Sequence, residues 1–74
     1  MIETCTVKID KSNKIDTLNI LLNLTNIYTG WLSYEANASK SLKERITSLA
    51  DSGIDDAIEV FIEHFGAYVK LKII

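Results

Sequence analysis

The sequence predicts an α/β (α+β) domain in which three helices cover one face of a three-stranded sheet, in the order β-α-β-α-α-β. Three observations support this fold class. Apolar and polar residues alternate with a period of two near both ends, at residues 4–10 and 68–74. Apolar residues recur at helical spacing between these segments. The 74 residues contain no proline, repeat or low-complexity run, so residues 1–74 are expected to form one small domain.

The first strand is predicted at residues 4–10, where every second residue from Cys5 to Ile9 is apolar. The polar segment "DKSNK" ends this strand. A helix is expected to begin at Asp16, whose carboxylate can accept hydrogen bonds from the free amides of a first turn. Apolar residues follow at helical spacing, and Gly30 is expected to end the helix.

A second strand is predicted at residues 31–36, "WLSYEA", because β-type residues alternate there with polar ones. A second helix follows. Ser41 and Glu44 fit the capping-box pattern Ser-x-x-Glu, in which each side chain binds a free backbone amide at a helix start. Gly53 is expected to end this helix.

A third helix is predicted to start at Asp55 or Asp56 and to end at Gly66. Residues 57–63 also allow a strand, but the strand pattern fits fewer apolar positions than the helical one. The last strand, at residues 68–74, is the most apolar of the three. We therefore expect it to be central, which gives the sheet order 1-3-2.

One segment resembles a known family. The run "ANASKSLKERITSLADSG" is similar to the start and end of a helix in the bacterial phosphocarrier family HPr. The matching residues are Asn37, Ala38, Lys40, Ser41 and Leu42, with a looser match at Ser48 and Leu49. The chain departs from the family in having "KSNKID", without a histidine, in the loop where the family carries its phosphorylatable histidine. It also lacks the family's hairpin strand before the second helix, and its third helix precedes the last strand. The resemblance implies a degenerate relative without phosphocarrier chemistry.

The residues that commonly carry catalysis do not form a recognisable pattern. His64 is the only histidine and is expected in the last turn of a helix, where a cation is favoured. Cys5 is expected to be a small buried apolar residue, and a single cysteine allows no intramolecular disulfide. The acidic residues of the third helix suit a helix start and a solvated face. The sequence therefore predicts no catalytic residue, no metal site and no cofactor.

Charge and hydropathy restrict the partners. The net charge is -2, and the eight Lys and Arg residues are scattered, so nucleic acid is not expected to be a ligand. Residues 17–34 carry no charge, but Asn, Thr and Gly interrupt them, which argues against a membrane span. The first residues do not resemble a secretory signal, so a cytoplasmic protein is expected.

The first predicted helix supplies a candidate partner-binding surface. Asn19, Asn23 and Asn26 recur at spacings of four and three and would make a polar face without charge, which is cheaper to desolvate than a charged one. Tyr28 and Trp31 follow at the end of the same helix. We interpret the chain as a non-catalytic intracellular protein-binding or regulatory module that binds a protein partner or itself as a homo-oligomer. A simple bias toward Asn in the sequence explains the face equally well.

The second predicted helix supplies an alternative site. Ser39, Lys40, Ser41 and Lys43 surround its expected N-terminus, where free amides favour anions. These residues could hold an anion, or Ser41 could be phosphorylated in the manner of an HPr-like protein. Ordinary helix capping explains the same residues more simply. A structural subunit that completes a thin core by self-association is a further hypothesis.

Overall fold

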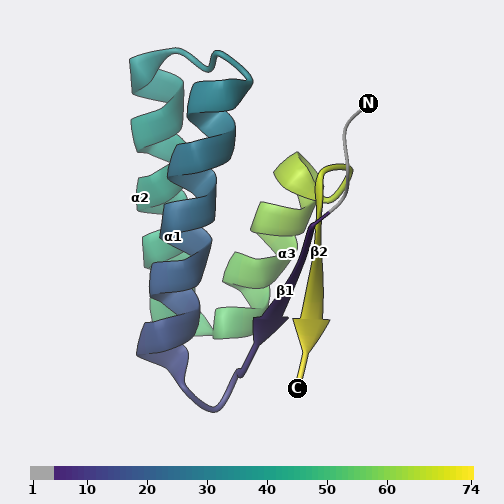
Figure 1. The fold of residues 1–74 in the computed structure, drawn as a ribbon. Helices are drawn as coiled ribbons and strands as arrows, with labels where there is room; N and C mark the ends of the chain where they lie inside the picture. Colours follow the sequence, from purple (N-terminus) through teal and green to yellow (C-terminus); the bar gives the residue numbers. More distant parts are fainter. Residues whose placement is uncertain (1–4) are drawn as a thin grey trace.

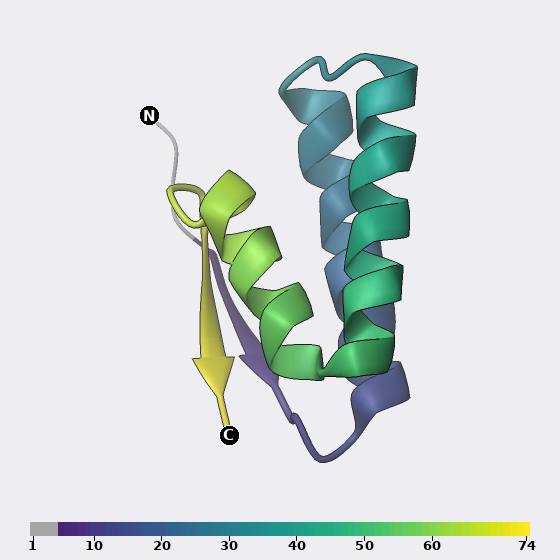
Figure 2. The same cartoon turned by 180° about the vertical axis from the view of Figure 1, so that it is seen from behind.

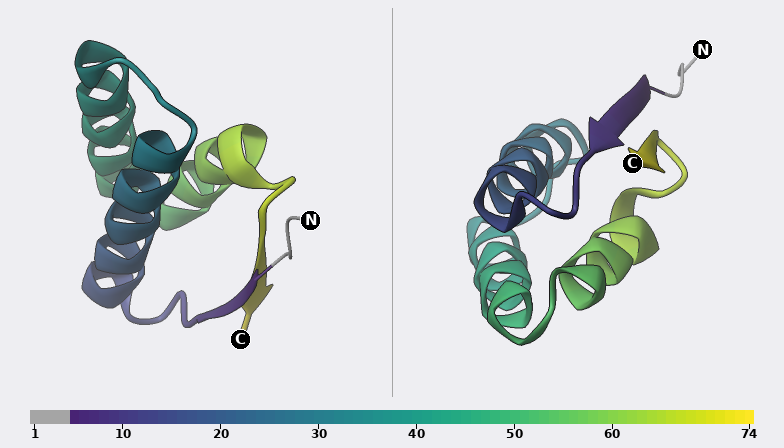
Figure 3. Two further views of the ribbon diagram at one scale, coloured as in Figure 1. Left: turned by 45° about the horizontal axis from the view of Figure 1, so that its top comes forward. Right: turned by 90° about the horizontal axis from the view of Figure 1, so that it is seen from below.

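The computed structural model describes residues 5–74 as three helices beside a small parallel sheet (Figures 1 and 2). Along the described chain the elements are β1 (Cys5–Ile9), α1 (Lys14–Trp31), α2 (Ala36–Ser52), α3 (Ile54–Phe65) and β2 (Val69–Ile73). The helices α1 and α2 run antiparallel side by side, and α3 packs against both of them (Figure 1). Seen from below, the strands lie beside α1 and α3, on the side away from α2 (Figure 3, right).

The sheet differs from the prediction. Within residues 5–74 it has two strands, and β1 pairs directly and in parallel with β2. Ile9 is opposite Ile73, and Lys8 is opposite Lys72. Both strands lie inside the predicted ranges, although Thr4, the first residue of the predicted range 4–10, is outside the described residues. The prediction of a three-stranded sheet with order 1-3-2 is therefore wrong.

The missing strand is the one predicted at residues 31–36. Trp31 is the last residue of α1, and α2 begins only five residues later. The turn between the helices is a Schellman motif, in which Tyr34 N–H donates to the Thr29 carbonyl at 2.9 Å and Ser33 N–H donates to the Gly30 carbonyl at 3.3 Å. Ser33 takes the left-handed conformation that this motif requires, with φ of 61°. These bonds end the helix after Trp31, so the prediction that Gly30 ends it is also wrong.

The helix starts differ from the predictions as well. Asn13 caps α1, because its side-chain oxygen accepts a hydrogen bond from the Asp16 amide at 3.1 Å. Asp16 therefore lies in the first turn and is not the cap. The helix α2 begins at Ala36 without a side-chain cap, so Ser41 lies in its second turn. The predicted capping box at Ser41 is wrong.

The core lies where α3 meets the other helices and the sheet. Phe61 and Phe65 of α3 are completely buried, as are Leu21 of α1 and Ile46 of α2. The helix α3 packs against both α1 and α2. Its most buried positions recur at helical spacing, so the helical interpretation of residues 57–63 is confirmed and the alternative strand is excluded.

Three threonines on α1 are almost completely buried. Their hydroxyl groups donate to backbone carbonyls: Thr25 to Leu21 at 2.7 Å, Thr29 to Thr25 at 2.7 Å, and Thr17 to Asp10 at 2.8 Å. Each hydroxyl has an acceptor on its own or the preceding segment, and among residues 5–74 no buried side-chain nitrogen or oxygen lacks a hydrogen-bond partner. The threonines therefore act as small core residues.

Candidate functional site

Two large apolar side chains of α1 are exposed next to each other. Ile27 is 62% exposed and Trp31 is 53% exposed. They are four residues apart in one helix, so they lie on the same side of it, one turn from each other. We call these two residues the Ile27–Trp31 surface. Large exposed apolar side chains grouped together on a small protein are typical of interaction sites.

Trp31 is held in place by aromatic rings beneath and beside it. Its ring meets Tyr68 edge-on, with centroids 5.7 Å apart, and Tyr28 at 6.1 Å. Tyr28 in turn stacks on Tyr68 at 6.2 Å and on the buried Phe65 at 5.8 Å. The rings connect the end of α1 to the end of α3 and the start of β2. Aromatic pairs in these geometries are favourable beyond the area they bury, so they stabilise the position of Trp31.

The flanks of the Ile27–Trp31 surface on α1 carry no charge. Asn23 and Gly30 lie beside it on one side and Leu24 on the other, and all residues from Thr17 to Trp31 are uncharged. A surface with this composition can be removed from water without desolvating an ion.

The predicted partner-binding residues are divided between two sides of α1. Asn19, Asn23 and Asn26 are exposed, and the amide oxygen of Asn26 accepts a hydrogen bond from the Lys43 ammonium at 2.7 Å. Asn26 thus faces α2. Tyr28 and Trp31 point toward α3 and β2, as their ring contacts show. The structure therefore brings Tyr28 and Trp31 together but separates them from Asn26.

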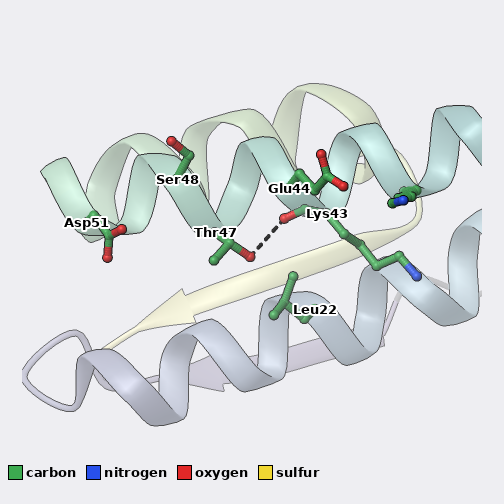
Figure 4. A pocket seen from close by; sticks show the side chains of 7 residues that line it. Leu22, Lys43, Glu44, Thr47, Ser48 and Asp51 are labelled. Carbon is green, nitrogen blue, oxygen red and sulfur yellow. Dashed lines mark hydrogen bonds between the residues drawn. The ribbon is translucent and has the colours of Figure 1, made fainter.

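A shallow groove with a cavity volume of about 420 Å³ runs between α1 and α2. Leu22 projects from α1 toward Thr47 and Lys43 of α2, as Figure 4 shows. The Thr47 hydroxyl donates to the Lys43 carbonyl at 2.9 Å (Figure 4). The other residues that line the groove are Lys40, Glu44, Ser48 and Asp51. Cationic and anionic groups both border it, so its charge selects no class of ligand.

The four residues of the predicted anion site point in different directions. The Ser39 hydroxyl lies 3.0 Å from that of Thr29, in the contact between α1 and α2. Lys40 and Lys43 border the groove described above. Ser41 lies on another side of α2, where it shares a small hollow with Arg45 and His64. The structure does not bring Ser39, Ser41 and the two lysines together around one position.

Close groupings of ionisable side chains are few among residues 5–74. Among residues 5–74 no three His, Cys, Asp or Glu side chains come close enough to hold a metal ion. His64 contacts the Val60 carbonyl through Nδ1 at 3.0 Å, one turn back in its own helix. The ion pair found in this part of the chain joins Lys11 to Asp55 at 2.7 Å on the surface. Across the same residues, no helix combines the length and the apolar character that crossing a bilayer requires.

The sequence interpretation did not identify Ile27 as part of the surface or Tyr68 as the residue that supports Trp31. Helical spacing alone places Ile27 with the other apolar residues of the first helix, because α1 is apolar around most of its circumference and periodicity does not separate its sides. Tyr68 was assigned only to the last strand. The tertiary contact between Tyr68 and Trp31 spans 37 positions in the sequence, 68 minus 31, and no local pattern indicates it.

Neither the scan of protein-family models nor the searches of curated proteins and of solved structures found a match to this chain. The resemblance to the HPr family therefore stays a prediction.

Proposed function

We propose that this chain is a non-catalytic protein-binding module, and that a second copy of the chain docks on the Ile27–Trp31 surface. The observation that carries the proposal is the exposure of these two large apolar side chains on adjacent turns of α1. Burying apolar surface contributes about 25 cal/mol for each Å² removed from water. Tryptophan is also among the residues that most often dominate binding energy in interfaces.

The support beneath Trp31 favours binding. A side chain that must be ordered on association loses conformational entropy, which weakens the complex. Trp31 is already positioned by Tyr28 and Tyr68, through ring contacts at 6.1 Å and 5.7 Å. The surface is therefore largely preorganised before a partner arrives.

The absence of charge on this part of α1 favours a second copy as the partner. In a two-fold dimer the same surface meets itself, so any charge on it would face a like charge. The residues Thr17–Trp31 carry no charged side chain. A chain of 74 residues also buries a small fraction of its surface, so association adds proportionally more to its stability than it would in a larger domain.

Sedimentation equilibrium tests the proposal. The wild-type chain is expected to form a dimer at high micromolar concentration, and Ile27→Asp is expected to be monomeric because each copy would bury a carboxylate. Asn19→Asp is the matched control, since it adds the same charge to an exposed position of α1 that lies about two turns before Ile27. A monomeric wild type, or equal weakening by both substitutions, would contradict the proposal.

A further inference from the structure

The outer face of the sheet carries three lysines. Side chains alternate across a strand, so Thr6 and Lys8 of β1 share the outer face with Lys70 and Lys72 of β2. Lys8 and Lys72 are directly opposite each other. Like charges in this arrangement destabilise a sheet. None of the ion pairs or side-chain hydrogen bonds found within residues 5–74 involves these three lysines.

The inner face of β2 is incompletely covered. Ile9 and Ile73 are at the same level of the sheet, yet Ile9 is completely buried and Ile73 is 42% exposed. Within residues 5–74 each strand pairs only with the other, so the difference comes from the position of β2 and not from strand pairing. Figures 1 and 2 show β2 at the side of the sheet away from the α1–α2 pair. Apolar surface is therefore uncovered at the free edge of β2.

The free edge also offers backbone hydrogen-bonding groups. The Ile74 N–H donates to the Ile9 carbonyl at 2.8 Å, on the side of β2 that faces β1. Because the amide groups of successive residues point to opposite sides of a strand, those of Leu71 and Ile73 point to the free edge. Unpaired groups of this kind are a template for an added strand.

We infer that the free edge of β2 binds an extended acidic segment of a partner protein as a third strand. Acidic side chains on one side of the segment would face Lys70 and Lys72. Apolar side chains on its other side would cover Leu71 and Ile73, and its backbone would pair with the free edge. A second copy of β2 does not suit this edge, since its own lysines would face Lys70 and Lys72.

A peptide titration followed by nuclear magnetic resonance tests this inference. The probe is a short peptide of alternating Glu and Val, and its control alternates Lys and Val. The acidic peptide is expected to shift the amide resonances of Val69–Ile73 and to slow hydrogen exchange at Leu71 and Ile73. The double variant Lys70→Glu, Lys72→Glu is expected to bind the acidic peptide at least about tenfold more weakly than the wild type, because two charge pairs become repulsive.

The matched control is Lys14→Glu with Lys40→Glu, which changes the net charge equally at exposed helical positions. It is expected to bind the acidic peptide as the wild type does. The test variant should fold, since Glu at position 72 would attract Lys8. The inference would be overturned if the two double variants bound the acidic peptide equally, or if the wild type did not bind it. It would also be overturned if the lysines bound a single-stranded oligonucleotide and not the acidic peptide.

Discussion

The ring of Trp31 packs edge-on against the ring of Tyr68, with their centroids 5.7 Å apart. This contact joins the last residue of α1 to the residue that precedes β2, and Tyr28 lies against both rings. The exposed tryptophan is therefore positioned by the tertiary fold and not by α1 alone.

Removing the Tyr68 ring should weaken the fold. Tyr68→Ala is expected to lower the free energy of unfolding by about 1–3 kcal/mol, because it removes apolar burial and two aromatic contacts. Tyr68→Phe keeps the ring and is expected to change the free energy of unfolding by less than about 1 kcal/mol. Urea denaturation of the two variants measures the difference. Equal losses would show that the ring contacts contribute nothing.

Substitutions at two polar positions distinguish the true helix cap from the predicted one. Asn13→Ala is expected to cost about 1 kcal/mol, because it removes the acceptor of the Asp16 amide. Ser41→Ala is expected to be neutral or to stabilise by up to about 0.5 kcal/mol, because Ala is the better helix former inside α2. Thermal or urea unfolding of both variants shows which substitution lowers the stability more. A greater loss from Ser41→Ala would restore the capping box.

The left-handed conformation of Ser33 provides another test. Ser33→Gly is expected to stabilise the protein by roughly 0.5–1 kcal/mol, since glycine adopts positive φ without steric cost. Ser48→Gly is the comparison, because Ser48 is exposed inside α2 and glycine there should destabilise by about 0.5–1 kcal/mol. The two substitutions are therefore expected to change the free energy of unfolding in opposite directions. A loss of stability from Ser33→Gly would contradict the observed turn.

The buried threonine at position 25 separates hydrogen bonding from packing. Thr25→Val keeps the shape of the side chain but removes its hydroxyl. The Leu21 carbonyl can still accept the ordinary helical hydrogen bond from the backbone N–H of residue 25. We expect a change of less than about 1 kcal/mol. Thr25→Ala also removes a methyl group from the core and is expected to cost about 1–2 kcal/mol. If the two variants unfold at the same denaturant concentration, packing is not the main role of this residue.

Local patterns predicted the two strands at the ends of the chain and the existence of three helices. Alternation at residues 4–10 and 68–74 indicated strands, because these segments have one covered and one exposed face. The segment 31–36 has a similar alternation but forms the end of α1 and a turn. Its backbone is satisfied by the Schellman bonds from Ser33 and Tyr34, which a count of alternating residues does not reveal.

The candidate site was predicted less completely than the fold. Tyr28 and Trp31 were identified from residue type and do lie together. The sequence does not show that Ile27 is exposed or that Asn26 contacts α2. The packing of α2 and α3 on α1, which is apolar around most of its circumference, decides which of its sides stay exposed to solvent. The lysines at the sheet became a cluster only through the parallel pairing of two strands that are distant in sequence.

The fluorescence of Trp31 as a function of protein concentration tests self-association at this surface most directly. Trp31 is the only tryptophan in the 74 residues, so the emission reports the Ile27–Trp31 surface alone. At high concentration a dimer should shield the indole, giving a blue-shifted emission and weak quenching by acrylamide. On dilution the emission should shift to the red and quenching should increase until both match the Ile27→Asp variant. Emission and quenching that stay constant across the dilution series and equal to those of the variant would contradict the account.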